Sequence, residues 1–236
     1  TGWVGRLLDQ QKRKPFHAIE VDNSLSLLMK GKHVNGIATR NADLFFKTTQ
    51  DPYVKNVLKQ QQDVHLNEHN LGYLYRTMIE AESSTGYIYE TSRTFRSSVT
   101  YPDNALAKQL KTIAAFINSG LSTEIYYATL GGFDTHVNQL NIQKRLLKVY
   151  DESVAAFIKD LKAHDRFNDT LIMTFSEFGR RVKQNAANGT DHGTTNNVFL
   201  IGGKLKQQGM YNEAPDLLNL DDNGDLMHKV DFRSIY

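Results

Sequence analysis

Two short, almost continuously apolar segments flank one long amphipathic segment, and this order constrains the fold more than any other feature. TEIYYATL (residues 123–130) and DTLIMTF (169–175) are rich in β-branched and aromatic residues, which is typical of buried strands. Between them, residues 139–164 repeat apolar side chains at helical spacing. A strand, a long helix and a second strand form the βαβ unit of a parallel sheet. The sequence therefore predicts an α/β fold with a mainly parallel sheet and helices on both faces.

Neighbouring segments extend this prediction. NNVFLIGG (196–203) is expected to add a third strand. Residues 101–120 predict a helix that is capped by Asp103 or Asn104 and ended by Gly120.

The first hundred residues carry weaker signals. FHAIEV (16–21) predicts a short strand, and DPYVKNVLKQQ (51–61) predicts a helix with proline at its first position. We expect one domain over residues 1–236, in which residues 1–100 are peripheral and residues 101–236 form the core that carries the functional loops.

The composition narrows the classes of partner and cofactor. The formal charge is only +2, from 28 basic and 26 acidic residues, so nucleic-acid binding is not expected. No apolar stretch approaches the roughly 18 residues of a membrane-spanning helix. The chain has no cysteine, so any metal must be held by histidine and carboxylate groups. The pair His65 and His69 is better explained as solvated surface, because its surroundings are polar and show no clear helical stripe.

Two polar loops follow the ends of the two predicted strands. GGFDTHVNQ (131–139) follows the first, and TFSEFGRRVKQNAANGTDHGTTN (174–196) includes and follows the end of the second. In a parallel sheet, the loops after the carboxyl ends of neighbouring strands converge at one edge. We therefore expect five acidic and imidazole side chains from both loops to lie together, namely Asp134, His136, Glu177, Asp191 and His192.

These side chains are hard or borderline metal ligands, and a set without thiolate suits zinc, manganese or a similar divalent ion. Such an ion would activate a water or hydroxyl nucleophile and hold the oxygens of a phosphate or sulfate ester. Arg180 and Arg181 offer guanidinium groups to the same oxyanion. The expected partner is therefore a small-molecule ester or oxyanion.

Each residue also has a purely structural interpretation. Asp134 would cap the following helix or accept backbone hydrogen bonds in a turn, and Glu177 would face the positive end of a helix. Asp191 and His192 lie between glycines, where turn formers are common, and the two arginines would be surface charges. A nucleotide-binding domain is disfavoured because no GxGxxG or GK[ST] loop follows a predicted strand. The shared position after strand ends is what favours a metal site.

Five segments together closely resemble the bacterial family called domain of unknown function 1501: GGFDTHVNQ, SVAAFIKDL, TFSEFGRRVKQN, NGTDHGT and IGGKLKQQGMY. The resemblance covers essentially the whole chain. This family is placed in the alkaline phosphatase and sulfatase superfamily, whose members carry one or two divalent metals on an α/β sheet and hydrolyse or transfer phosphate and sulfate esters. The resemblance implies that Asp134, His136 and His192 are metal ligands, that Glu177 replaces the Asp of a strand-end Asp-His motif, and that Asp191 is an additional candidate.

Two departures from the family pattern limit these expectations. Phe178 follows Glu177 where relatives carry histidine, so one ion or none is expected rather than two. Relatives carry their nucleophile and an early Asp ligand upstream of the segment that corresponds to TGW (residues 1–3), often after a twin-arginine export signal. The chain begins at Thr1 without an initiating methionine and is expected to be an internal piece of a longer exported protein, without an assignable nucleophile. The leading hypothesis is a metal-dependent ester hydrolase, and the alternative is a non-catalytic exported protein that uses the same fold for binding or assembly.

Overall fold

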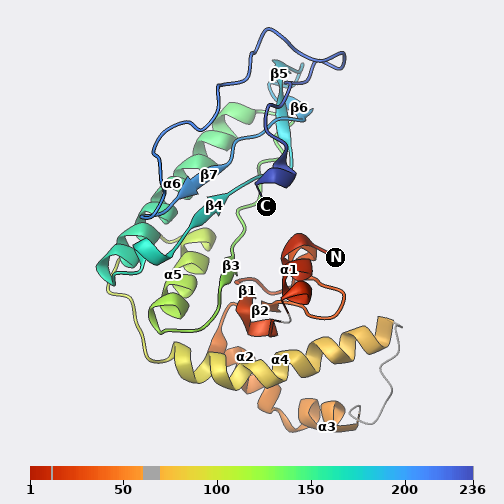
Figure 1. The fold of residues 1–236 in the computed structure, drawn as a ribbon, viewed down its shortest axis with the longest axis vertical. Helices are drawn as coiled ribbons and strands as arrows, with labels where there is room; N and C mark the ends of the chain where they lie inside the picture. The colour runs from red at the N-terminus through yellow and green to blue at the C-terminus, as the bar shows by residue number, and fades with distance from the viewer. Residues whose placement is uncertain (12, 61–69, 236) are drawn as a thin grey trace. The chain divides into compact units, whose positions relative to one another are not determined.

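The computed structural model describes residues 1–11, 13–60 and 70–235. The chain forms two compact units, Thr1–Thr129 and Leu130–Tyr236, whose elements are drawn in Figure 1. Every helix of the described residues is too short or too polar to cross a membrane.

The first unit contains a three-stranded parallel sheet in the order β2-β1-β3 (Figure 1). Its strands are β1 (Ala18–Glu20), β2 (Ile37–Ala38) and β3 (Ile125–Tyr127). Ile19 of the central strand is in register with Ile37 on one side and Tyr126 on the other. All three residues of β1 are buried. The predicted short strand within residues 16–21 is therefore confirmed, as the middle of a sheet.

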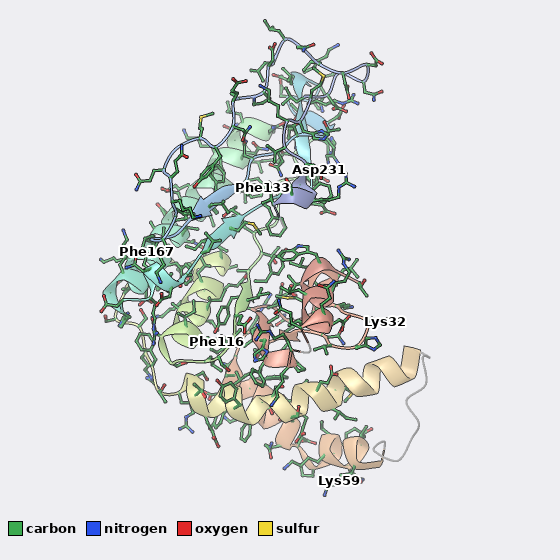
Figure 2. All side chains as sticks on the ribbon, in the orientation of Figure 1. Lys32, Lys59, Phe116, Phe133, Phe167 and Asp231 are labelled. Carbon is green, nitrogen blue, oxygen red and sulfur yellow. The ribbon has the colours of Figure 1, made fainter. Side chains whose placement is uncertain are left out.

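The first unit also contains helices, and the one predicted within residues 101–120 ends where the sequence indicates. The helices are α1 (Trp3–Gln10), α2 (Ala42–Gln50), α3 (Pro52–Gln60), α4 (Asn70–Ser92) and α5 (Ala105–Asn118), with short 3-10 turns η1 (Pro15–His17) and η2 (Leu27–Met29). The Asn104 side chain accepts the Ala107 N–H at 2.8 Å and caps α5. Gly120 has φ of 82°, which glycine adopts without strain, and it follows the end of that helix. Phe116 of α5, labelled in Figure 2, is only 2% exposed and belongs to the core.

The second unit combines one long helix with two antiparallel strand pairs. Its elements are α6 (Gln139–Ala163), η3 (Phe167–Asp169), β4 (Ile172–Thr174), β5 (Gly179–Gln184), β6 (Thr190–Gly193), β7 (Phe199–Ile201) and η4 (Phe232–Ser234). The predicted helix is confirmed, but only its second half buries the expected apolar stripe. Val154, Phe157 and Leu161 are buried, whereas Leu140 is 80% exposed and Leu147 is 54% exposed.

The predicted α/β class is confirmed as a mixed α/β structure, but the mainly parallel sheet is not present among the described residues. Parallel pairing is confined there to β2-β1-β3, whereas β4 and β7 pair antiparallel with Ile172 opposite Ile201. β3 and β4 belong to different sheets, so the prediction of a βαβ unit around α6 is wrong. A hairpin, rather than a crossover helix, lies between β4 and β7. Parallel neighbours need a crossover connection, which is usually a helix, so β7 returns beside β4 in the opposite direction.

Candidate metal centre

The polar segment 174–196 was expected to be a loop, but it contains a β-hairpin. β5 and β6 pair antiparallel, with Arg180 opposite His192. The Asn185 side chain closes the turn by accepting backbone N–H groups, including that of Gly189 at 3.0 Å. The hairpin fixes the positions of side chains that were predicted to lie in an irregular loop.

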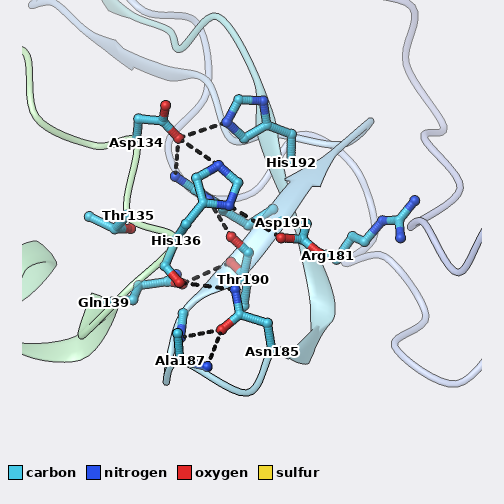
Figure 3. Close-up of polar contacts among 12 residues, drawn as sticks. Asp134, Thr135, His136, Gln139, Arg181, Asn185, Ala187, Thr190, Asp191 and His192 are labelled. Atoms are coloured by element: carbon cyan, nitrogen blue, oxygen red, sulfur yellow. Dashed lines mark hydrogen bonds and ion pairs between the residues drawn. The ribbon is translucent and has the colours of Figure 1, made fainter.

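Residues 131–138, called here the metal-site loop, lie against this hairpin (Figure 3). The Asn185 side chain donates to the His136 carbonyl oxygen at 2.9 Å, and the Asn138 N–H donates to a carbonyl oxygen of the turn at 3.1 Å. A Cβ atom at Gly189 would overlap the backbone carbonyl of His136. A glycine at this position therefore permits the close approach that brings the two segments together.

Asp134, His136 and His192 form a candidate metal-binding triad, called here the Asp-His-His cluster. The Oδ1 atom of Asp134 lies 2.7 Å from Nε2 of His192 and 3.0 Å from Nε2 of His136. One ligand atom from each of the three residues lies within 4.8 Å of the others. Asp134 and His192 are exposed and His136 is half-buried, so the cluster is open to solvent.

The cluster keeps its carboxylate ionised. The hydrogen bond from His192 lowers the pKa of Asp134, and it outweighs the opposing effect of desolvation. The charges of His136 and Arg180 lower this pKa further. Asp134 is therefore negatively charged at neutral pH, as a metal ligand must be.

One carboxylate oxygen and two imidazole nitrogens fit a single zinc or manganese ion better than magnesium or calcium, which prefer oxygen ligands throughout. Tetrahedral zinc ligands at about 2.0–2.1 Å from the ion are separated by about 3.3–3.4 Å. The contacts of Asp134 at 2.7 and 3.0 Å are hydrogen-bond distances and would widen by several tenths of an ångström. The ligand atoms lie within 4.8 Å of one another. The residues present thus fit one ion after the side chains adjust to equal separations.

Asp191 and Phe178 contact the two imidazoles from outside the cluster. Asp191 Oδ1 lies 3.2 Å from Nδ1 of His136, on the other side of the ring from the nitrogen that faces Asp134. The ring of Phe178 stacks on His192 with 3.8 Å between centroids and 12° between planes. These contacts restrict the orientation of both rings.

Arg180 joins the metal-site loop to the hairpin. Its Nη1 donates to the Thr190 carbonyl oxygen at 2.5 Å, and its Nη2 donates to the Phe133 carbonyl oxygen at 2.5 Å. The same Nη2 lies 3.3 Å from Asp134 Oδ1. The guanidinium predicted to bind an oxyanion is thus engaged by protein oxygens.

The structure does not bring the remaining predicted residues into the cluster. Glu177 is exposed and its carboxylate is not among the clustered ligand atoms. Arg181 donates from Nε to Asp225 Oδ1 at 3.1 Å, and its side chain extends away from the imidazoles (Figure 3). The pair His65 and His69 lies outside the described residues.

Sequence reasoning missed Phe178, Asn185 and Gly189 as determinants of this site. Asn188 followed by Gly189 was a usable signal, because Asn-Gly between two strands is a strong indication of a hairpin. Asn188 does adopt a left-handed conformation with φ of 57°. The stacking of Phe178 on His192 has no comparable signal in the sequence, because an isolated aromatic residue occurs in many structural settings.

Comparison with known proteins places the chain in a family without assigning an activity. A model of the family described as "Protein of unknown function (DUF1501)" matches residues 2–230. No curated protein and no solved structure matches the chain. The match spans nearly all of the sequence, including the candidate metal centre. The chain therefore belongs to the DUF1501 family of proteins of unknown function.

Proposed function

We propose that the chain provides the metal site of a hydrolase that acts on phosphate or sulfate esters, as in the alkaline phosphatase and sulfatase superfamily that its motifs resemble. The observation that carries this proposal is the convergence of Asp134, His136 and His192 from two separate segments, with their ligand atoms within 4.8 Å of one another. Three protein ligands of this kind are typical of catalytic zinc sites, which keep one position open.

The residues have distinct parts in this proposal. The cluster would bind one divalent cation, which supplies Lewis acidity that stabilises negative charge on an ester's oxygens. The ionised Asp134 offsets the charge of the cation, and the exposed faces of Asp134 and His192 leave access for a substrate. Arg180 keeps the metal-site loop on the hairpin through its two carbonyl contacts and contributes a positive charge beside the cluster.

Metal binding is the first test. The metal-stripped protein is titrated with Zn²⁺ and with Mn²⁺ in a calorimeter, and we expect one ion per chain. Asp134→Ala and His192→Ala should abolish this binding, whereas Asp151→Ala, which removes an exposed carboxylate from α6, should leave it unchanged. Free metal at a hundred times its Kd should stabilise the second unit by about 2.7 kcal/mol.

Hydrolysis is the second test. The metal-loaded protein is assayed with p-nitrophenyl phosphate and p-nitrophenyl sulfate, and turnover of one of them should disappear in Asp134→Ala. Stoichiometric metal without turnover of either ester would contradict the hydrolase and leave only the metal site.

A non-catalytic binding or assembly protein is the second candidate, and one observation favours it. Asp134 Oδ1 lies within hydrogen-bond distance of His192, His136 and Arg180, so the polar cluster is internally satisfied without an ion. The second unit also exposes large apolar side chains, including Met210 at 74% and Leu218 at 94%. Absence of metal binding, with an unchanged melting temperature in excess Zn²⁺ or Mn²⁺, would support this candidate over the hydrolase.

A further inference from the structure

The two ring nitrogens of His136 face two different carboxylates. Nε2 lies 3.0 Å from Asp134 Oδ1, inside the cluster, and Nδ1 lies 3.2 Å from Asp191 Oδ1, outside it. Asp191 belongs to β6 and directly precedes His192. The hairpin therefore supplies both the candidate ligand His192 and the carboxylate that contacts His136.

The distribution of donors around these carboxylates decides where the proton of a neutral His136 lies. Asp134 Oδ1 is approached by His192 at 2.7 Å and by the Arg180 guanidinium at 3.3 Å, so donors other than His136 stabilise it. The Nδ1–H of His136 can therefore be donated to Asp191, which leaves the Nε2 lone pair directed into the cluster. A neutral imidazole binds a metal only through the nitrogen that carries no proton.

We propose that Asp191 is a positioning residue, which accepts the Nδ1–H of His136 and selects the tautomer whose Nε2 is available to the metal. This inference rests on the proposed metal site, and it gives Asp191 a role other than that of a ligand, which the sequence alone predicts. The distances support it, because the Asp191 oxygen lies beside the ring nitrogen that does not face Asp134. A carboxylate behind a ligand histidine fixes the orientation of the ring and strengthens the ligand, and its loss typically weakens metal binding about 10–100-fold.

Nitrogen-15 NMR of the imidazoles tests the tautomer without any metal. Spectra of metal-free protein are recorded at about pH 9, where an ordinary imidazole is neutral, and the His136 signals are assigned by their loss in His136→Gln. We expect the Nδ1–H form in the wild type and a shift towards the Nε2–H form in Asp191→Ala. Asp191→Asn keeps an accepting oxygen and should retain the wild-type tautomer, and Asp151→Ala serves as the exposed carboxylate control.

Zn²⁺ affinity, measured by competition with a chelator, tests the consequence. We expect Asp191→Ala to bind one ion about 10–100-fold more weakly and Asp191→Asn to lose less. Loss of all Zn²⁺ binding in a folded Asp191→Ala protein would overturn the inference, because it would make Asp191 a ligand. An unchanged tautomer and affinity would also overturn it, while the proposed function would stand. If the wild type bound no metal but its tautomer still changed in Asp191→Ala, the proposed function would fail and the control of His136 by Asp191 would be supported.

Discussion

Replacement of Arg180 by alanine should detach the metal-site loop from the hairpin. The Arg180 side chain is only 16% exposed, and its guanidinium donates to the carbonyl oxygens of Thr190 and Phe133. A hydrogen bond with a charged donor contributes about 1.5–3 kcal/mol. The two contributions are not fully additive, and water reaches part of the freed surface. We therefore expect Arg180→Ala to lower the free energy of unfolding of the second unit by about 2–4 kcal/mol.

The assay must report on the second unit. The single tryptophan is Trp3 of α1 in the first unit, so its fluorescence does not serve. Hydrogen exchange with mass spectrometry on peptides covering residues 131–138 and 179–193 reports local opening directly. A loss of 2–4 kcal/mol corresponds to about 30–1000-fold faster exchange where opening limits it.

Two variants sharpen the interpretation. Arg180→Lys keeps the charge but cannot reproduce the planar fork that reaches both carbonyl oxygens, so its exchange should be intermediate. Arg145→Ala removes an exposed arginine from α6 and should change stability by less than about 0.5 kcal/mol. Unchanged exchange in Arg180→Ala would refute the structural role and restore the oxyanion-binding role that the sequence alone suggested.

Three further changes test other contacts. Gly189→Ala should weaken Zn²⁺ binding more than tenfold in calorimetry, because its Cβ would overlap the metal-site loop, whereas Gly131→Ala meets no atom within 4 Å and should bind normally. Burial raises the pKa of Asp9, but three backbone N–H groups more than compensate and hold it below its ordinary value. Its stabilisation is thus present above about pH 4 and lost as pH falls through the lowered pKa. Tryptophan-detected urea unfolding should therefore show that Asp9→Asn costs about 1.5–3 kcal/mol at pH 7 and progressively less as the pH falls below about 4. Asn104→Ala removes the cap of α5 and should cost about 1 kcal/mol in the same unfolding experiment, so an unchanged midpoint would contradict the cap.

The local elements were predictable because their signals are local. Apolar spacing and a cap located α5 and α6 nearly to their ends, and β-branched residues located β4 and β7. Strand direction was not predictable from the same signals. A continuous apolar run is typical of parallel strands, but it does not fix the direction of a strand, and β4 and β7 pair antiparallel. The direction of β7 depends on the hairpin that precedes it.

The candidate site was predicted in part, but its residues converge for a different structural reason from the one predicted. Asp134, His136 and His192 do lie together, although parallel strands β3 and β4 were expected to bring them there. The convergence comes instead from the turn at residues 185–189, whose contacts attach the metal-site loop to the hairpin.

The alternation of side chains along a strand explains why adjacent residues of the motif have different roles. Successive side chains of an extended strand point to opposite faces, so Arg180 and Arg181 of β5 cannot both face the cluster. Arg180 faces it, while Arg181 forms an ion pair with Asp225. On β6, His192 contacts Asp134 within the cluster, and Asp191 contacts the far nitrogen of His136. Once the hairpin is recognised, the arginine pair can supply only one residue to the cluster centre, which leaves the other free for contacts outside it.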